Sequence, residues 1–136
     1  MTSPSQQDFL VISRGRWDAG ASDAAIQSAI DAFYAWLDGH IAAGRMRAGS
    51  RLGIEGATVS SRGVLMDGPF GETKELIGGF WVVSAPTLEA ASHLLADSPT
   101  LALGLFYEVR PLDGQRATAG MHATETLDRR DTVASR

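Results

Sequence analysis

Two short segments of this chain are apolar at every position, and they constrain the fold more than any other feature. They are residues 9–12 and 80–83, and both are rich in the β-branched and aromatic residues that favour strands. Successive side chains of a strand point to opposite faces of a sheet, so a sheet with one wet face alternates apolar and polar residues. These two segments do not alternate. We therefore expect a sheet that is covered on both faces.

Two other segments show the periodicity of helices. In the first, Ser22 is a suitable N-cap, and apolar residues recur at spacings of three and four over residues 26–41. Gly44 ends this helix. Gly39 lies inside it at a cost of about 1 kcal/mol relative to alanine, so we expect the last turn to fray or bend there. In the second segment, Thr87 caps a shorter helix that stops at an Asp-Ser-Pro sequence.

The remaining segments indicate short strands and turns. Residues 14–21 are expected to form a loop, and a Ser-Arg-Gly turn is expected to join the two strands of a hairpin. The further strands are expected at residues 52–54, 57–60, 64–66 and 105–110. The order strand, helix, hairpin, strand, helix, strand is typical of an α+β domain with two helices on one face of an antiparallel sheet. We expect a ferredoxin-like layout with an extra hairpin.

Two helices cover only one face of such a sheet, so the other face needs a different cover. We expect a second copy of the chain, forming a homodimer through the sheet faces that buries on the order of 1,000 Å² or more. The alternative cover is the polar C-terminal tail, residues 113–136, which is expected to be disordered or lightly docked. Residues 1–7 are expected to be loose, which leaves one domain over residues 8–112.

Composition excludes several functional classes. A chain of 136 residues with 44% hydrophobic content is ordinary for one globular domain. Its net charge of −4 offers no field that attracts phosphates, which disfavours direct binding of nucleic acid. It contains no cysteine, which excludes a thiolate nucleophile and cysteine-based metal sites. No apolar run approaches the ~20 residues of a membrane helix, so we expect a cytoplasmic protein without a membrane contact.

The most specific motif spans residues 67–81 and reads DGPFGETKELIGGFW. This run resembles the signature of the YCII-related family, in its DGPF subgroup. The resemblance covers roughly residues 8–112 and implies a ferredoxin-like domain of the dimeric α+β barrel type. Genes of this subgroup commonly lie near extracytoplasmic-function sigma factors, so the resemblance also implies a regulatory association. The acidic charge of the chain directs that association to a protein or a metabolite rather than to DNA.

Asp67 opens this motif at the point where a strand is expected to end. A carboxylate at a strand end beside a cleft is a candidate general acid or base. The alternative is that Asp67 accepts hydrogen bonds from the following amides and holds the turn. Glu72 and Lys74 match the family motif position by position, and we take them, with Phe70, as candidate ligand-binding residues. The alternatives are a solvated charged loop and an aromatic core plug.

Glu108 and Arg110 lie two residues apart on the last expected strand, so their side chains share a face. They belong to a Glu-Val-Arg-Pro segment that resembles the end of the family domain. An acid on a sheet face that is expected to be buried needs a cationic partner, and Arg51 or Arg110 is suitable. We take Glu108 and Arg110 as further candidate ligand-binding residues. A structural salt bridge is the alternative interpretation.

The histidines and the loops provide no clear cofactor or metal site. His40 is expected to cap the first helix or to be solvated, and His93 is expected on the polar side of the second helix. In YCII-related proteins outside the DGPF subgroup, a histidine in the first helix and an aspartate in the sheet are the proposed acid/base pair, but this chain has Asp31, Ala32 and Phe33 in that region. No sequence has the spacing of a metal site or a phosphate-binding loop, so we expect no metal and no cofactor.

Two functions from different classes fit these observations. The first is a small-molecule-binding or regulatory accessory protein whose ligand is a small organic acid. The second is a cofactor-independent enzyme, an isomerase, lyase or hydrolase, that uses Asp67 as general acid or base. We favour the first, because the missing helix histidine leaves one aspartate to carry a mechanism alone.

Overall fold

The computed structural model describes residues 5–67 and 77–119. The described residues form six strands and two helices, with one short 3₁₀ helix before the last strand. The elements are β1 (Gln7–Gly15), α1 (Asp23–Ala42), β2 (Met46–Arg51), β3 (Gly56–Ser60), β4 (Gly63–Asp67), β5 (Ile77–Ala85), α2 (Leu88–Leu95), η1 (Leu101–Leu103) and β6 (Leu105–Pro111).

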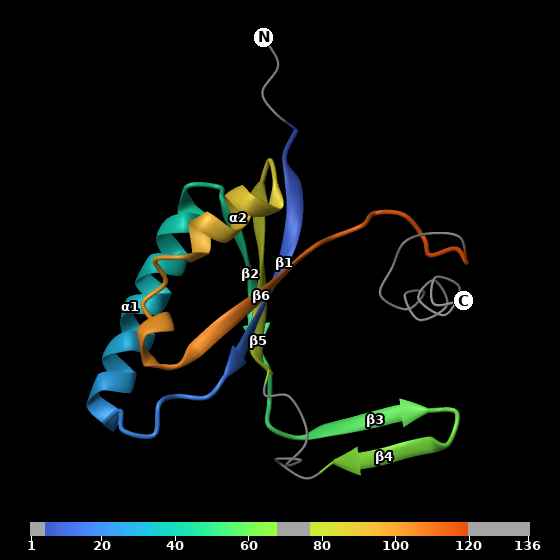
Figure 1. The fold of residues 1–136 in the computed structure, drawn as a ribbon, viewed down its shortest axis with the longest axis horizontal. Helices are drawn as coiled ribbons and strands as arrows, with labels where there is room; N and C mark the ends of the chain where they lie inside the picture. The colour runs from blue at the N-terminus through green and yellow to red at the C-terminus, as the bar shows by residue number, and fades with distance from the viewer. Residues whose placement is uncertain (1–4, 68–76, 120–136) are drawn as a thin grey trace, which may run out of the picture.

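Four of the strands form one antiparallel sheet in the order β2-β5-β1-β6. Both helices lie on the same face of this sheet (Figure 1). The sheet thus consists of two β-α-β units, β1-α1-β2 and β5-α2-β6. The first strands of these units, β1 and β5, lie in the centre of the sheet. The expected ferredoxin-like α+β fold is confirmed.

The core lies between this sheet and the helices. Phe9 and Val11 of β1 are fully buried, and they lie opposite Val83 and Trp81 of β5. Leu37 of α1 packs against these residues. Because side chains alternate along a strand, every second residue of the two central strands points into this core. The rest of each apolar segment must point to the other face.

The face of the sheet opposite the helices, which we call the open face, has an apolar centre. Leu10 lies opposite Val82, and Ile12 lies opposite Phe80, whose exposed fraction is 37%. No described residue covers this centre as the helices cover the core. Residues 113–119 are exposed and lead away from the sheet (Figure 1). The described part of the chain therefore leaves the open face without the cover that its sequence predicts.

The ends of the helices follow the predicted capping residues. Ser22 Oγ accepts a hydrogen bond from the amide of Ala25, and Thr87 Oγ1 accepts one from the amide of Ala90, both at 3.0 Å. The expectation of fraying at Gly39 is wrong, because α1 continues through this residue to Ala42. These caps fix where each helix starts and thus how its apolar side meets the sheet.

Two segment assignments from the sequence are corrected. β2 occupies Met46–Arg51, where no strand was expected, and the strand expected at residues 52–54 lies in the connection to β3. Only Met46 of β2 is buried, so this edge strand lacks the apolar alternation that identifies a strand. β1 also continues through Arg14 and Gly15, which the sequence placed in a loop.

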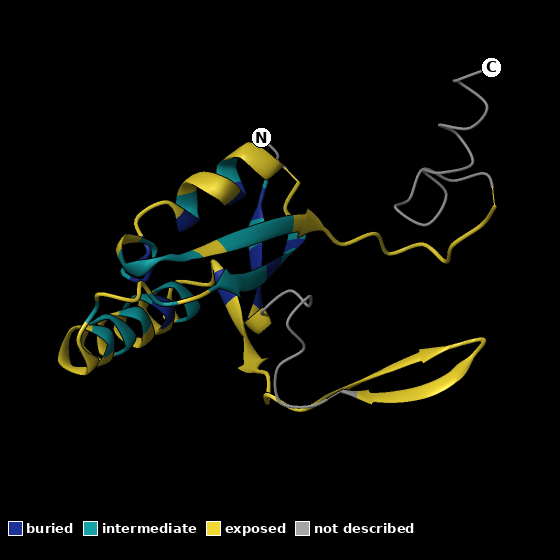
Figure 2. Ribbon diagram, turned by 60° about the horizontal axis from the view of Figure 1, so that its bottom comes forward, coloured by how far each residue is buried: buried dark blue, intermediate teal, exposed yellow. Residues whose placement is uncertain are grey.

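The expected hairpin is present, but it is not part of the main sheet. β3 and β4 pair only with each other, joined by a turn at Ser61 and Arg62. The hairpin projects away from the rest of the domain, and its described residues are exposed throughout (Figure 2). Asp67 is the last residue of β4, as expected for a strand end, but that strand belongs to the separate hairpin.

Candidate functional site

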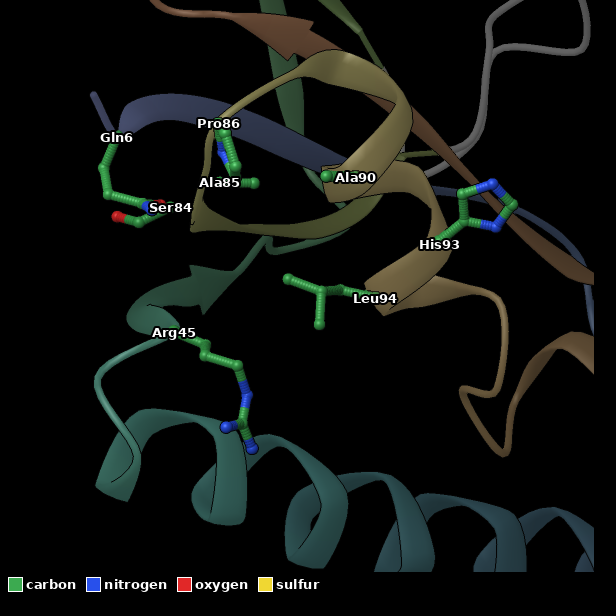
Figure 3. Close-up of a pocket in the computed structure, with 8 residues that line it drawn as sticks. All are labelled: Gln6, Arg45, Ser84, Ala85, Pro86, Ala90, His93 and Leu94. Carbon is green, nitrogen blue, oxygen red and sulfur yellow. The ribbon is translucent and has the colours of Figure 1, made fainter. Parts of the chain in front are cut away.

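A surface cleft of about 500 Å³ lies where the end of α1, the start of β2, the end of β5 and α2 come together (Figure 3). This volume is within the range of small-molecule sites in proteins. Its lining is mainly apolar, with one charged arginine. The lining residues are Gln6, Arg45, Ser84, Ala85, Pro86, Ala90, His93 and Leu94.

Arg45 supplies the cationic group of this cleft. It directly follows Gly44, whose left-handed backbone (φ 80°) ends α1. The backbone of Arg45 is held at both ends, since its amide donates to the carbonyl of His40 and its carbonyl accepts from the amide of Ser84, each at 2.9 Å. The side chain extends from β2 toward α1, and Leu94 reaches toward the same space from α2 (Figure 3). Arg45 and Leu94 thus both line the cleft, and the guanidinium of Arg45 lies at its edge, over α1.

His40 orients the guanidinium of Arg45. The Nε of Arg45 donates to Nδ1 of His40 at 2.8 Å. An Nδ1 atom accepts a hydrogen bond only in the neutral imidazole, whose other nitrogen then carries the proton. The pKa of His40 is lowered, first by its burial and then by the charge of Arg45, while Asp97 opposes the shift. The neutral form that this hydrogen bond needs is therefore favoured near pH 7.

The imidazole of His40 is itself held from the other side. The ring of Trp36 packs edge-on against it, with 4.9 Å between ring centroids. Trp36 Nε1 donates to Oδ1 of Asp97 at 3.0 Å, which ties α1 to the end of α2. These contacts fix the positions of both helices beside the cleft. Arg45 is thereby the last member of a chain of contacts that begins in the helix layer.

An ion pair on the open face contacts Ser84, one of the residues that line the cleft. Ser84 Oγ donates to Oδ1 of Asp8 at 2.8 Å, and Arg47 donates to both oxygens of the same carboxylate at 3.3 and 3.0 Å. The pKa of Asp8 is lowered by these hydrogen bonds, that of Arg47 having the larger effect. Asp8 is therefore ionised and satisfied near neutral pH. It fixes the end of β5 rather than providing a proton carrier.

A second charged group lies on the open face. Glu108 accepts hydrogen bonds from Arg14 on one oxygen and from Arg110 on the other. These contacts lower the pKa of Glu108, Arg110 having the larger effect. We call these three residues the arginine–glutamate cluster. Arg110 is thus confirmed as a partner of Glu108, and the second partner is Arg14 rather than Arg51, because β1 adjoins β6 whereas β2 lies at the far edge of the sheet.

A scan against protein-family models matches residues 9–113 to the YCII-related domain. This match spans most of the chain. The protein belongs to the YCII-related domain family. A search of curated proteins finds no match.

The YCII-related motif contains most of the residues that the sequence proposed for a site. Asp67 ends β4, and of its side chain nothing is described. Phe70, Glu72 and Lys74 lie outside the described residues. The chain enters β5 within this motif at Ile77, which pairs with Arg14 of the arginine–glutamate cluster. The roles proposed for these motif residues stay predictions.

Sequence reasoning missed the residues of the cleft. His40 was expected to cap a helix or to be solvated, and its contact with Arg45 across the helix end was not foreseen. The available signal was the Gly44–Arg45 step, since a basic residue directly after a helix-ending glycine lies close to the last turn. His93 is exposed as expected, with Glu89 Oε1 3.7 Å away, and its ring points away from the other residues of the cleft (Figure 3).

Within residues 5–67 and 77–119, no group of three or more metal-ligating side chains is placed to hold an ion. No helix in the same ranges combines the length and the apolar character that crossing a membrane requires.

Proposed function

We propose that this YCII-related protein, a member of the DGPF subgroup, is a small-molecule-binding accessory protein that takes a small organic acid in the cleft beside α2 and the end of β5. The observation that carries the proposal is the hydrogen bond from Arg45 to His40, which holds a guanidinium at the edge of a cleft whose lining is mainly apolar. The apolar residues Ala85, Ala90 and Leu94 suit the body of a ligand. The guanidinium suits its carboxylate.

The geometry of Arg45 favours one mode of carboxylate binding. Its Nε is used by His40, so a ligand carboxylate would meet the two terminal nitrogens of the guanidinium in a bidentate pair. Hydrogen bonds to a charged group contribute about 1.5–3 kcal/mol each. Arginine also holds its position here at little entropic cost, because His40 already fixes the side chain. We therefore expect acids to bind better than neutral molecules of the same shape.

The cleft favours binding over proton transfer. His40 is kept in the neutral form and its Nδ1 is already engaged by Arg45, while Asp8 and Glu108 are carboxylates that their arginine partners keep ionised. A general acid or base needs a pKa close to the working pH and access to the substrate. None of these described groups meets both conditions, which supports an accessory role for the cleft, and the alternative enzyme depends on Asp67 alone.

The same proposal includes a homodimer formed through the open faces. Leu10, Ile12, Phe80 and Val82 provide an apolar centre, and the arginine–glutamate cluster lies beside it. A ligand in the cleft contacts the end of β5, a central strand of the sheet that would form the interface. Ligand binding would therefore act on the dimer interface, which is a route for regulation.

The test is a calorimetric titration with straight-chain monocarboxylates of increasing length and with the matching primary amides. We expect the acids to bind more tightly than the amides, and the substitution Arg45→Gln to weaken acid binding at least tenfold, about 1.4 kcal/mol. Arg62→Gln is the matched control, because Arg62 is exposed in the turn of the hairpin, away from the cleft.

Three results would contradict the proposal. They are acids that bind no better than amides, binding that survives Arg45→Gln, and a loss of binding that is specific to Arg110→Gln, which would move the site to the arginine–glutamate cluster. Turnover of any of these acids that Asp67→Asn abolishes in a folded protein would instead support the enzyme.

A further inference from the structure

The hairpin of β3 and β4, residues 56–67, which we call the arm, exposes large apolar side chains. The exposed fractions are 75% for Val59, 66% for Val64, 64% for Leu65 and 73% for Met66. An isolated two-stranded hairpin is marginally stable in water, and it gains independent stability only by packing against further structure. The described part of this chain supplies none, since the arm pairs only with itself. The arm thus has the character of an interaction surface.

The strand register divides the arm into two different faces. Val59 pairs with Val64, and Ala57 pairs with Met66. Residues two apart on a strand share a face, so these four apolar side chains lie together. The opposite face contains Leu65, which pairs with Thr58. One side of the arm is therefore entirely apolar along these pairs, and the other is mixed.

The arm extends from the sheet on the side away from the helices (Figure 1), and a second view shows the same arrangement (Figure 2). The open face of the sheet looks to that side as well. Two apolar surfaces that lack a cover among the described residues thus border the same region of space. A single occupant placed against the open face would also be flanked by the arm.

The area argues for one interface that includes both surfaces. A valine or methionine side chain buries on the order of 100 Å², so the three large residues of the apolar arm face, Val59, Val64 and Met66, offer roughly 300 Å² in each copy. A stable interface buries about 1,200–2,000 Å² in total. Two arms alone fall short of this area, whereas two arms together with two open faces can reach it. A second copy of the chain supplies one arm and one open face, the same number as the first copy, so it is the occupant that fits.

We propose that in the dimer each arm packs its apolar face, Ala57, Val59, Val64 and Met66, against the other copy, so that the two copies hold each other by exchanged arms. This inference rests on the proposed homodimer through the open faces and adds a separate contact to it. In an isologous pair the same contact occurs twice, so each copy both provides an arm and receives one.

The test uses the absence of cysteine from the chain. We compare the single variants Val64→Cys and Leu65→Cys, whose native side chains are neighbours with nearly equal exposed fractions, 66% and 64%, but point to opposite faces of the arm. The rate of thiol modification by a maleimide is measured at protein concentrations above and below the dimer dissociation constant, which analytical ultracentrifugation supplies. The unfolded variants give the maximal rate.

We expect the thiol of Val64→Cys to react at least tenfold more slowly than that of Leu65→Cys in the dimer, and the difference to disappear on dilution. Equal rates in a dimer would overturn the exchanged arms and leave the dimer through the open faces intact. A chain that stays monomeric would overturn both. Protection at position 64 in a monomer would place the arm on its own chain and also overturn the inference.

A second position and a second measurement guard against a variant that disturbs the dimer. Val59→Cys probes the same apolar face from β3, and we expect it to behave as Val64→Cys does. Amide hydrogen exchange of the unmodified chain provides an independent check. We expect the amides of residues 57–66 to gain protection in the dimer, and unchanged exchange across the dissociation constant would overturn the inference.

Discussion

At the scale of single residues, the contact between Arg45 and His40 gives the cleft its chemistry. A guanidinium on an exposed loop normally samples many rotamers, and holding it costs entropy. Here the neutral imidazole of His40 accepts from Nε, and the Trp36 ring supports the imidazole. The orientation of the cation therefore depends on the protonation state of its neighbour.

This dependence predicts an effect of pH on stability. The pKa of His40 is lowered in the folded protein from its ordinary 6.5, so the unfolded chain takes up the proton first as the pH falls. The contribution of neutral His40 to the free energy of unfolding is fully present above about pH 6.5, and it is lost as the pH falls through the lowered pKa. We expect urea unfolding at pH 7.5 and 5.5 to show a smaller loss of stability in His40→Gln than in the parent. His93→Gln, at an exposed position, should behave as the parent does, and an equal loss in all three proteins would contradict the assignment.

At the scale of secondary-structure elements, the sequence predicts those elements whose signals are local. Ser22 and Thr87 mark helix starts because a capping hydroxyl acts within its own turn, and residues 9–12 and 80–83 mark central strands because both of their faces are apolar. β2 escapes prediction because only Met46 of its residues is buried. Its place in the sheet is determined by pairing with β5, which lies about thirty residues away and leaves no periodic pattern in the strand itself.

The pairing of β2 with β5 predicts the effect of a small substitution. A Cβ atom on Gly49 would lie 2.0 Å from the carbonyl oxygen of Phe80, so one of the two strands would have to move. We expect Gly49→Ala to destabilise the protein by about 1–3 kcal/mol in urea unfolding. Gly53→Ala is the control, because a Cβ there meets nothing within 4 Å, and it should change stability by less than about 0.5 kcal/mol. Equal stability of the two variants would show that β2 tolerates the shift.

At the scale of the whole molecule, the sequence predicts the arginine–glutamate cluster better than it predicts the cleft. Glu108 and Arg110 could be paired in advance, because two residues of equal parity on one strand share a face. The cleft could not be predicted, because its lining comes from segments that lie far apart in the chain, and no local pattern encodes the distance between them. The apolar parity of the central strands, by contrast, predicts directly that the face opposite the helices is also apolar and needs a cover.

The assembly can be tested by placing a charge in the centre of the open face. Phe80 lies there with an exposed fraction of 37%, and Leu88, on the helix side, has one of 47%. We expect both positions to tolerate a lysine in an isolated chain, because each side chain already contacts water. If two open faces pack together, Phe80→Lys buries an unpaired cation in each copy, which costs several kcal/mol, and the variant should sediment as a folded monomer at concentrations where Leu88→Lys sediments as a dimer. A parent chain that sediments as a monomer, or a Phe80→Lys variant that dimerises as tightly as the parent, would show that the open face has a different cover.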